Sequence, residues 1–132
     1  IPRELGELSS QQFVSLANNS LYGSLPTEFG ELTALEEFSI IGSELVGTIP
    51  TEWSQWSSIR KIILDRNCLT GKLPTELGVL TTLQYFAVSE NNLLGTLPSE
   101  LGRWTRLRIL ALNGNEMIGS IPTELGNLMA LE

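Results

Sequence analysis

The chain has no histidine and only one cysteine, Cys68. Histidine is the commonest general base and metal ligand, so its absence argues against Ser-His-Asp or Cys-His catalysis and against the usual metal sites. A single cysteine cannot form a disulfide within the chain, and we interpret Cys68 as a free thiol. Cytosolic proteins and interior repeats of secreted proteins both show this pattern, so the redox compartment stays open. We therefore expect no enzyme, no bound metal and no cofactor.

Positive charge and long apolar runs are also scarce. Eight Lys and Arg residues stand against fifteen Asp and Glu residues, giving a net charge of −7, and the basic residues are not gathered in one block. Nucleic-acid-binding proteins usually carry a basic patch or stripe, so we expect no nucleic-acid partner. No apolar run is long enough to span a bilayer, so we expect no direct membrane insertion by this segment.

The chain is instead organised by an internal repeat of 24 residues. The six prolines are Pro2, Pro26, Pro50, Pro74, Pro98 and Pro122, and every interval between them is 24 residues. A fixed period of this length is typical of a solenoid. We predict that residues 1–132 form one solenoid fragment of about five and a half repeats, without capping repeats. Because the chain begins and ends within a repeat, we expect it to be an internal piece of a longer protein.

Each repeat contains one strand signal followed by a polar corner. Phe86 and Val88 are two residues apart, the spacing of side chains on one face of a strand. The equivalent pairs are Val14/Leu16, Phe38/Ile40, Ile62/Leu64 and Leu110/Leu112. One strand per turn predicts a parallel sheet along one side of the coil. Asparagine side chains, which donate and accept hydrogen bonds, follow as a predicted buried ladder at Asn19, Asn67, Asn91 and Asn115. Ser43 interrupts this ladder, and we expect a water or a loosened corner there.

The glycines and prolines of the repeat predict its remaining backbone. Glycines at Gly23, Gly47, Gly71, Gly95 and Gly119 indicate a tight position or a positive φ. The Pro-Thr-Glu-Leu-Gly motif predicts a short helical turn, since proline is tolerated early and glutamate is favoured near the positive end. We expect these glutamates to accept local backbone N–H bonds.

The pattern L-x-x-L-x-x-L-x-L-x-x-N-x-L-x-G-x-I/L-P-x-E-L-G-x resembles the plant-specific leucine-rich-repeat class over the whole chain. The resemblance implies an α/β solenoid, a right-handed curved coil with a concave parallel sheet and short 3-10 segments on its convex side. Proteins of this class are typically receptor-kinase ectodomains, receptor-like proteins and cell-wall inhibitors, with ligands on the concave or lateral surface. The implied function is binding of a protein or peptide ligand, outside the cell or at its surface. A scaffold subunit of a larger complex is the alternative, and an organelle or the cytoplasm stays open, as does the oligomeric state.

Two departures from the repeat concern its core. Gln11 stands at a leucine position, and we expect Phe13 to compensate for it. Trp53, Trp56 and Trp104 also replace leucine. A sugar-binding platform is conceivable for three tryptophans, but their columns are core columns, so we interpret them as core residues.

The outward positions of the strands form the candidate binding face. Charged and aromatic side chains gather there on three successive turns at Glu36, Glu37, Arg60, Lys61, Asp65, Arg66 and Tyr85. Arginine and aromatic residues are typical interface anchors, so one hypothesis is that this set contacts a protein partner. The other is that Glu36 pairs with Arg60 and Glu37 with Lys61 as solvated charges, and both stay open.

Two further surface features carry hypotheses. Asn18-Asn19-Ser20 matches the glycosylation acceptor pattern, so Asn18 carries a glycan if the protein is secreted. Hydroxyl residues recur beyond the glycines at Ser24, Thr48, Thr96 and Ser120. Such ranks suit an ice surface, but Lys72 interrupts this one, which leaves ice binding a remote alternative.

Overall fold

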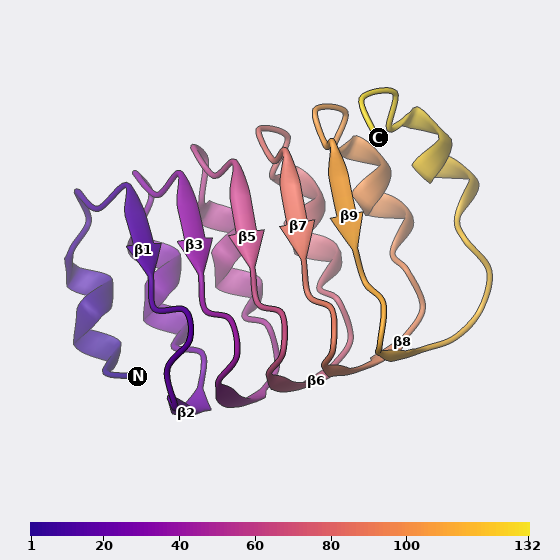
Figure 1. Cartoon of the computed structure of the whole chain (residues 1–132). Helices are drawn as coiled ribbons and strands as arrows, with labels where there is room; N and C mark the ends of the chain where they lie inside the picture. Colours follow the sequence, from indigo (N-terminus) through magenta and orange to yellow (C-terminus); the bar gives the residue numbers. More distant parts are fainter.

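The computed structural model, which describes residues 1–132, is a coil of stacked turns with a parallel sheet along one side (Figure 1). This sheet has the order β1-β3-β5-β7-β9, so each strand pairs with the equivalent strand of the next turn. Its strands are β1 (Phe13–Ser15), β3 (Glu37–Ser39), β5 (Lys61–Ile63), β7 (Tyr85–Ala87) and β9 (Ile109–Ala111). The predicted solenoid class is confirmed.

The register of this sheet follows the 24-residue repeat. Phe38 lies opposite Ile62, and Ile62 lies opposite Phe86, so the inward side chains of successive turns stack directly. The second inward residue of each predicted pair lies just beyond the strand, where ladder bonds such as Ile40 N–H to the Ile63 carbonyl continue. Both inward columns are fully buried in the inner turns and partly buried in the end turns.

A second parallel sheet was not predicted. It runs along the lower edge of the coil in Figure 1, in the order β10-β8-β6-β4-β2. Its strands are β2 (Tyr22–Ser24), β4 (Glu44–Gly47), β6 (Cys68–Gly71), β8 (Asn92–Gly95) and β10 (Glu116–Met117). Four of these strands end at or beside a glycine of positive φ, and that glycine predicted only a tight position or a positive φ, not a strand.

Short 3-10 helices lie on the opposite side of the coil from the first sheet (Figure 1). They are η1 (Arg3–Glu7), η2 (Thr27–Glu31), η3 (Thr51–Gln55), η4 (Thr75–Val79), η5 (Ser99–Arg103) and η6 (Thr123–Asn127). Each begins directly after a repeat proline, as predicted. The expected role of the glutamates was wrong: Glu52 and Glu76, for example, accept a bond from the preceding threonine hydroxyl at 3.3 Å, and no side chain caps the helices. None of the helices has the length and apolar character needed to cross a membrane.

Two glycine columns allow the turns to pack closely. Gly71 has a φ of +78°, and a Cβ there would lie 2.7 Å from Thr48 Cγ2. This confirms the positive φ predicted for that column. The glycine of the Pro-Thr-Glu-Leu-Gly motif serves a different purpose: a Cβ on Gly78 would lie 2.7 Å from the Glu100 carbonyl oxygen of the next turn.

The asparagine ladder is present in the inner turns. Asn91 accepts a bond from Leu69 N–H at 3.0 Å and donates to the Leu64 carbonyl of the preceding turn at 2.9 Å. Asn67 and Asn115 make the same pair of bonds one turn before and one turn after. Asn19, in the first turn, does not fit the prediction: it is exposed, and its side chain bonds only carbonyls of its own turn.

The Ser43 corner is closed rather than loosened. The Ser43 hydroxyl is buried and donates to the Asn19 carbonyl at 3.0 Å. One hydroxyl therefore links the two turns directly, although it makes fewer hydrogen bonds than an asparagine would.

The tryptophans are core residues, as predicted. Trp53, Trp56 and Trp104 are 0% exposed, and Trp53 stacks on Trp56 at 4.3 Å between ring centroids. The indole N–H of Trp56 donates to the Phe29 carbonyl at 2.7 Å. The expectation for Phe13 was wrong: it is 59% exposed on the outer side of β1 and does not fill the place of Gln11.

Candidate functional site

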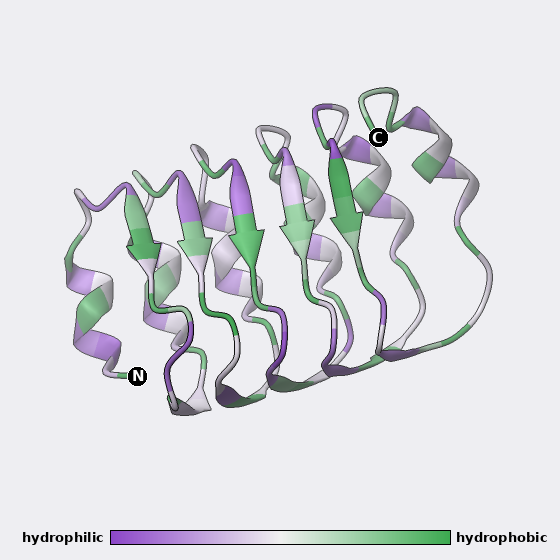
Figure 2. Ribbon diagram, viewed as in Figure 1, coloured by the Kyte–Doolittle hydropathy of each residue, from purple (hydrophilic) through white to green (hydrophobic).

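The outward side of the first sheet is the candidate binding surface, which we call the strand face. Its first column runs across the five strands as Phe13, Glu37, Lys61, Tyr85 and Ile109. In Figure 2, β1 and β9 are hydrophobic along most of their length, whereas β3 and β5 begin with hydrophilic residues. The face is therefore charged in its middle turns and apolar at both ends.

The structure divides the seven candidate residues into two groups along β5. The charged cluster consists of Glu36, Glu37, Arg60, Lys61 and Tyr85, which lie where β3, β5 and β7 begin. The turn cluster consists of the other two candidates, Asp65 and Arg66, together with Ser89 and Glu90, and it lies beyond the ends of β5 and β7. No ion pair or hydrogen bond joins the two groups, because the length of the strand separates them.

The charged cluster contains both ion pairs suggested by the repeat register. Arg60 Nε lies 3.5 Å from Glu36 Oε2, and Lys61 Nζ lies 4.0 Å from Glu37 Oε2. These side chains are between 28% and 59% exposed, so each pair stabilises the fold by only about 0–1 kcal/mol. Such pairs can open to meet a ligand at little cost, so their presence is compatible with both hypotheses.

Tyr85 is the aromatic centre of this cluster. Lys61 Nζ lies 5.6 Å from the centroid of the Tyr85 ring, within the range of a cation–π contact. The ring is half-buried between β5 and β9, whose opposite residues are Lys61 and Ile109. A half-buried tyrosine offers apolar area and a polar tip with little entropy to lose.

A shallow hollow next to Tyr85 extends the site beyond the predicted residues. It measures about 210 Å³ and is lined by Gln84, Tyr85, Arg108, Ile109 and Glu132. Arg108 Nε donates to Glu132 Oε1 at 2.8 Å across its rim. The sequence did not predict this hollow because its shape depends on side-chain directions, which the 24-residue spacing does not give.

The turn cluster is held mainly by bonds within the chain. Asp65 Oδ1 accepts a bond from Ser89 N–H at 2.6 Å, and Ser89 Oγ donates to Asn113 Oδ1 at 2.7 Å. Arg66 Nε lies 3.2 Å from Glu90 Oε2, and both residues have a positive φ. Asp65 therefore joins two neighbouring turns through its bond to Ser89, whether or not it also contacts a ligand.

Asn18 lies in the same column of positive-φ residues as Arg66 and Glu90, with a φ of 56°. Its side chain is exposed and makes no hydrogen bond, and Ser20 of the acceptor pattern is exposed as well. The site is thus accessible to modification, which leaves the glycosylation hypothesis standing as a prediction.

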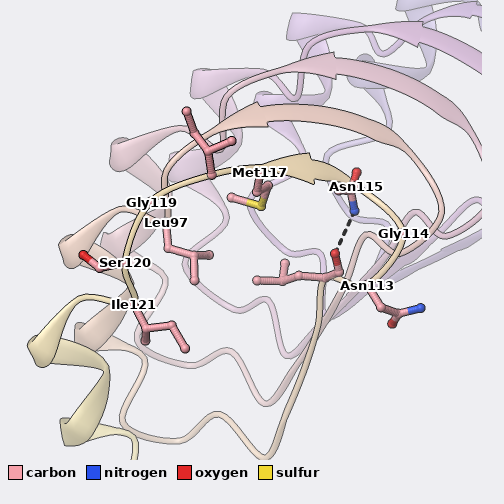
Figure 3. A pocket seen from close by; sticks show the side chains of 10 residues that line it. Leu97, Asn113, Gly114, Asn115, Met117, Gly119, Ser120 and Ile121 are labelled. Atoms are coloured by element: carbon pink, nitrogen blue, oxygen red, sulfur yellow. Dashed lines mark hydrogen bonds between the residues drawn. The ribbon is translucent and has the colours of Figure 1, made fainter.

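Another hollow lies at the last turn, where side chains of the core columns are left uncovered (Figure 3). It measures about 320 Å³, and Leu97, Met117 and Ile121 contribute apolar walls. Asn115 donates to the Leu112 carbonyl at its border. The residues that match Ile121 in inner turns, such as Ile49 and Leu73, are buried in the core. The hollow is therefore an open end of the core and has no convergent polar groups of a ligand site.

Comparisons with known proteins agree with this architecture. The Leucine Rich Repeat family model matches residues 82–104 and 106–128. No curated protein matches the chain. The solved structure of the plant peptide hormone receptor RGFR1 in complex with RGF2 is 32% identical with a TM-score of 0.98, over 99% of this chain and 21% of that chain.

Two further solved structures show the range of similar proteins. The Arabidopsis receptor kinase HAESA, in complex with the peptide hormone IDA and the co-receptor SERK1, is 32% identical with a TM-score of 0.96, over 99% of this chain and 22% of that chain. A plant ice-binding protein is 30% identical with a TM-score of 0.85, over 92% of this chain and 40% of that chain. The chain thus spans about a fifth of the length of the two receptor structures.

Proposed function

Because the chain is built from leucine-rich repeats of the plant type, we propose that it is a ligand-recognition module that binds a protein or peptide on its strand face. The observation that carries the proposal is the centre of that face: a half-buried tyrosine between a lysine and an apolar residue, beside an open hollow. The similar peptide hormone receptor RGFR1 was solved in complex with RGF2, and the similar receptor kinase HAESA in complex with the peptide hormone IDA. Both complexes support a peptide as the ligand class. We further propose that the parent protein is receptor-like or secreted, with this segment outside the cell.

The charged cluster sets the chemistry of the ligand. Glu36, Glu37, Arg60 and Lys61 together carry no net charge, so the cluster does not select strongly for an acidic or a basic peptide. Its exposed pairs can exchange partners with ligand groups of either sign. The hollow beside Tyr85 takes one apolar or aromatic side chain, and we expect that contact to dominate the affinity.

Selection of peptides from a displayed random library on the immobilised protein tests the proposal. We expect enrichment of peptides whose affinity falls about thirtyfold with Tyr85→Ala, the effect of removing an interface anchor worth about 2 kcal/mol. The double variant R60E/K61E also weakens binding, because both reversals face the ligand.

Matched controls lie on the helix side of the coil. Arg103 is exposed in η5 and forms no ion pair, so Arg103→Glu repeats the charge reversal away from the strand face. Val79 is 53% exposed in η4, so Val79→Ala repeats the truncation. Peptides that bind the strand-face variants as well as the unaltered protein would contradict the proposal, as would the absence of any enriched peptide.

A scaffold role would use the same face, so the partner distinguishes it from a receptor-like role. Crosslinking mass spectrometry on the native extract would then join Lys61 or Lys72 to one large partner in constant ratio. A receptor-like protein is expected to show no such constant partner and to carry a glycan on Asn18.

Ice binding is favoured by one observation, the likeness to a plant ice-binding protein. The hydroxyl rank of Ser24, Thr48, Thr96 and Ser120 is exposed along the coil, but the exposed Lys72 occupies its middle position. Thermal hysteresis of the purified protein measures this activity directly. Hysteresis that increases in a Lys72→Thr variant would support ice binding, and its absence in both proteins would exclude it.

A further inference from the structure

One charged candidate on the strand side of the coil has no partner of opposite charge. The other charged candidates are paired, as Glu36–Arg60, Glu37–Lys61 and Arg66–Glu90. Asp65 is in no ion pair, although Arg66 follows it directly in the chain. The carboxylate of Asp65 is therefore the one negative charge among these candidates that is not compensated within the chain.

Asp65 lies on the outward side of its turn. The neighbouring core residues Ile62 and Leu64 are 0% exposed, so the alternation of the chain turns Asp65 towards the strand face. Asp65 is partly buried, whereas Arg66 and Glu90 are exposed. A partly buried charge is screened less by water and salt than an exposed charge. A cation that reaches Asp65 therefore gains more than a cation that meets the exposed ion pairs of the charged cluster.

Ser89 holds the Asp65 carboxylate in one position. Its backbone N–H donates to Asp65 Oδ1 at 2.6 Å, and Ser89 itself is only 7% exposed. Asp65 Oδ2 makes no hydrogen bond within the chain. One carboxylate oxygen is thus fixed, and the other is available to a ligand. A fixed acceptor loses little conformational entropy when a ligand binds, which favours affinity.

Ser89 also orients a donor on its other side. Its hydroxyl donates to Asn113 Oδ1 at 2.7 Å, and Asn113 is exposed. Because the amide oxygen of Asn113 is bonded to Ser89, its amide nitrogen, which makes no bond within the chain, is the group presented to a ligand. Asp65 and Asn113 therefore place an acceptor and a donor on either side of Ser89, about 10 Å apart at about 4.8 Å per turn.

We propose, on the basis of the proposed function of the strand face, that the peptide ligand carries a lysine or arginine side chain that binds Asp65. A backbone carbonyl of the same ligand accepts a hydrogen bond from the Asn113 amide. Asp65 thereby makes the strand face selective for a basic peptide, whereas the charged cluster, whose charges cancel, is not selective. The net charge of the chain, −7, favours the approach of a cationic ligand as well.

The distance from Asp65 to the hollow beside Tyr85 limits the sequence of the ligand. Tyr85 and Ser89 are four residues apart on one turn, which corresponds to roughly 13 Å of extended chain. Between them lies Ala87, whose neighbours across the sheet are Ile63 and Ala111, so little side-chain bulk separates the two points. An extended peptide covers this distance with about four residues. We therefore expect the basic residue within about four residues of the apolar or aromatic residue that fills the hollow.

Two parallel selections from the displayed random library test the proposal, one on the unaltered protein and one on Asp65→Asn. Asparagine keeps an oxygen that accepts from Ser89 N–H, so this variant removes the charge and preserves the turn. We expect the peptides enriched on the unaltered protein to share a lysine or arginine. Their affinity is expected to fall at least about tenfold on Asp65→Asn.

Replacement of the shared basic residue of the peptide by glutamine completes a double-mutant cycle. On the unaltered protein it is expected to weaken binding by a similar factor. On Asp65→Asn it is expected to have little further effect, because the charge no longer has a partner. Asp65→Lys is a second variant, and we expect it to enrich peptides with an aspartate or glutamate in place of the basic residue.

Glu44→Gln is the matched control for the loss of one negative charge. Glu44 begins β4 in the second sheet, is exposed and is in no ion pair. Affinity for the same peptides is expected to stay within about twofold in this variant, because a single distant exposed charge is largely screened by salt. The control separates contact with Asp65 from general attraction by the net charge, and urea denaturation checks that each variant is folded.

The outcomes separate this inference from the proposed function. Peptides that depend on Tyr85 but bind Asp65→Asn equally well would overturn the role of Asp65 and leave ligand binding by the strand face intact. Enriched peptides without a shared basic residue would overturn it too. So would a loss on Asp65→Asn that persists with the glutamine peptide, since Asp65 would then act only through the fold of the turn. The absence of any enriched peptide would overturn the proposed function and this inference together.

Discussion

Replacement of Asn91 by alanine tests how the coil is held together at its buried corner. Asn91 is 6% exposed and makes four hydrogen bonds, one as acceptor from Leu69 N–H and three as donor. Its three carbonyl partners keep other donors: Leu64 keeps Asn67, Val88 keeps Asn115, and Ser89 keeps Arg66 N–H. Leu69 N–H, in contrast, loses its one acceptor.

The magnitude follows from this difference. An orphaned buried N–H costs about 1–3 kcal/mol, and the weakened carbonyl bonds add about 1 kcal/mol. We therefore expect Asn91→Ala to lower the free energy of unfolding by about 3 kcal/mol. The Asn19 side chain is exposed and accepts no bond, so Asn19→Ala is expected to cost only about 0.5–1 kcal/mol.

Urea denaturation followed by circular dichroism measures both variants against the unaltered protein, provided that the transitions remain two-state. Asn91→Ser is an informative third variant, because Ser43 already occupies this position in another turn. We expect it to lie between the other two. Equal losses for Asn91→Ala and Asn19→Ala would refute the reasoning, since they would show that the inter-turn bonds add nothing.

Three further predictions concern packing and modification. Gly78→Ala is expected to destabilise by about 1–3 kcal/mol because its Cβ would lie 2.7 Å from the Glu100 carbonyl, whereas Gly126→Ala, with no neighbour within 4 Å, is expected to be nearly neutral in the same assay. Trp104→Phe loses the bond from its indole N–H to the Leu77 carbonyl, whereas the buried indole N–H of Trp53 has no partner. Trp104→Phe should therefore be more destabilising than Trp53→Phe by about 1 kcal/mol. A lower unfolding temperature for Trp53→Phe than for Trp104→Phe would contradict this. Expression through a secretory pathway should add a glycan to Asn18, seen as a glycosidase-sensitive mass increase that Ser20→Ala abolishes. An unmodified Asn18 in that experiment would show that the exposed acceptor is not used.

Most of the fold could be predicted because the same residue types recur at the same positions in every turn. Proline, glycine and the inward pairs such as Phe86 and Val88 each fix a different part of the backbone. Their 24-residue spacing fixes the register as well. The second sheet escaped prediction because its strands are at most four residues long and end near glycine, so they lack a distinct strand pattern.

The candidate site could be predicted only in part. The pairing of Glu36 with Arg60 follows from the repeat, since residues 24 apart lie side by side. The separation of Arg60 from Arg66 along β5 and the hollow beside Tyr85 depend on side-chain directions that spacing does not give. The exposure of Phe13 was also missed, because Phe13 lies in the outward column of the first sheet, opposite Glu37, and not in a core column.

The most direct test of strand-face recognition places the photoreactive residue benzoylphenylalanine at position 85 in one variant and at position 79 in another. Each variant is irradiated with the peptides enriched from the displayed library, and the crosslinked product is identified by mass spectrometry. Strand-face recognition predicts a specific crosslink from position 85, which competes with unlabelled peptide, and none from position 79. A crosslink from position 79 alone, or equal crosslinking from both, would show that the ligand does not bind the strand face.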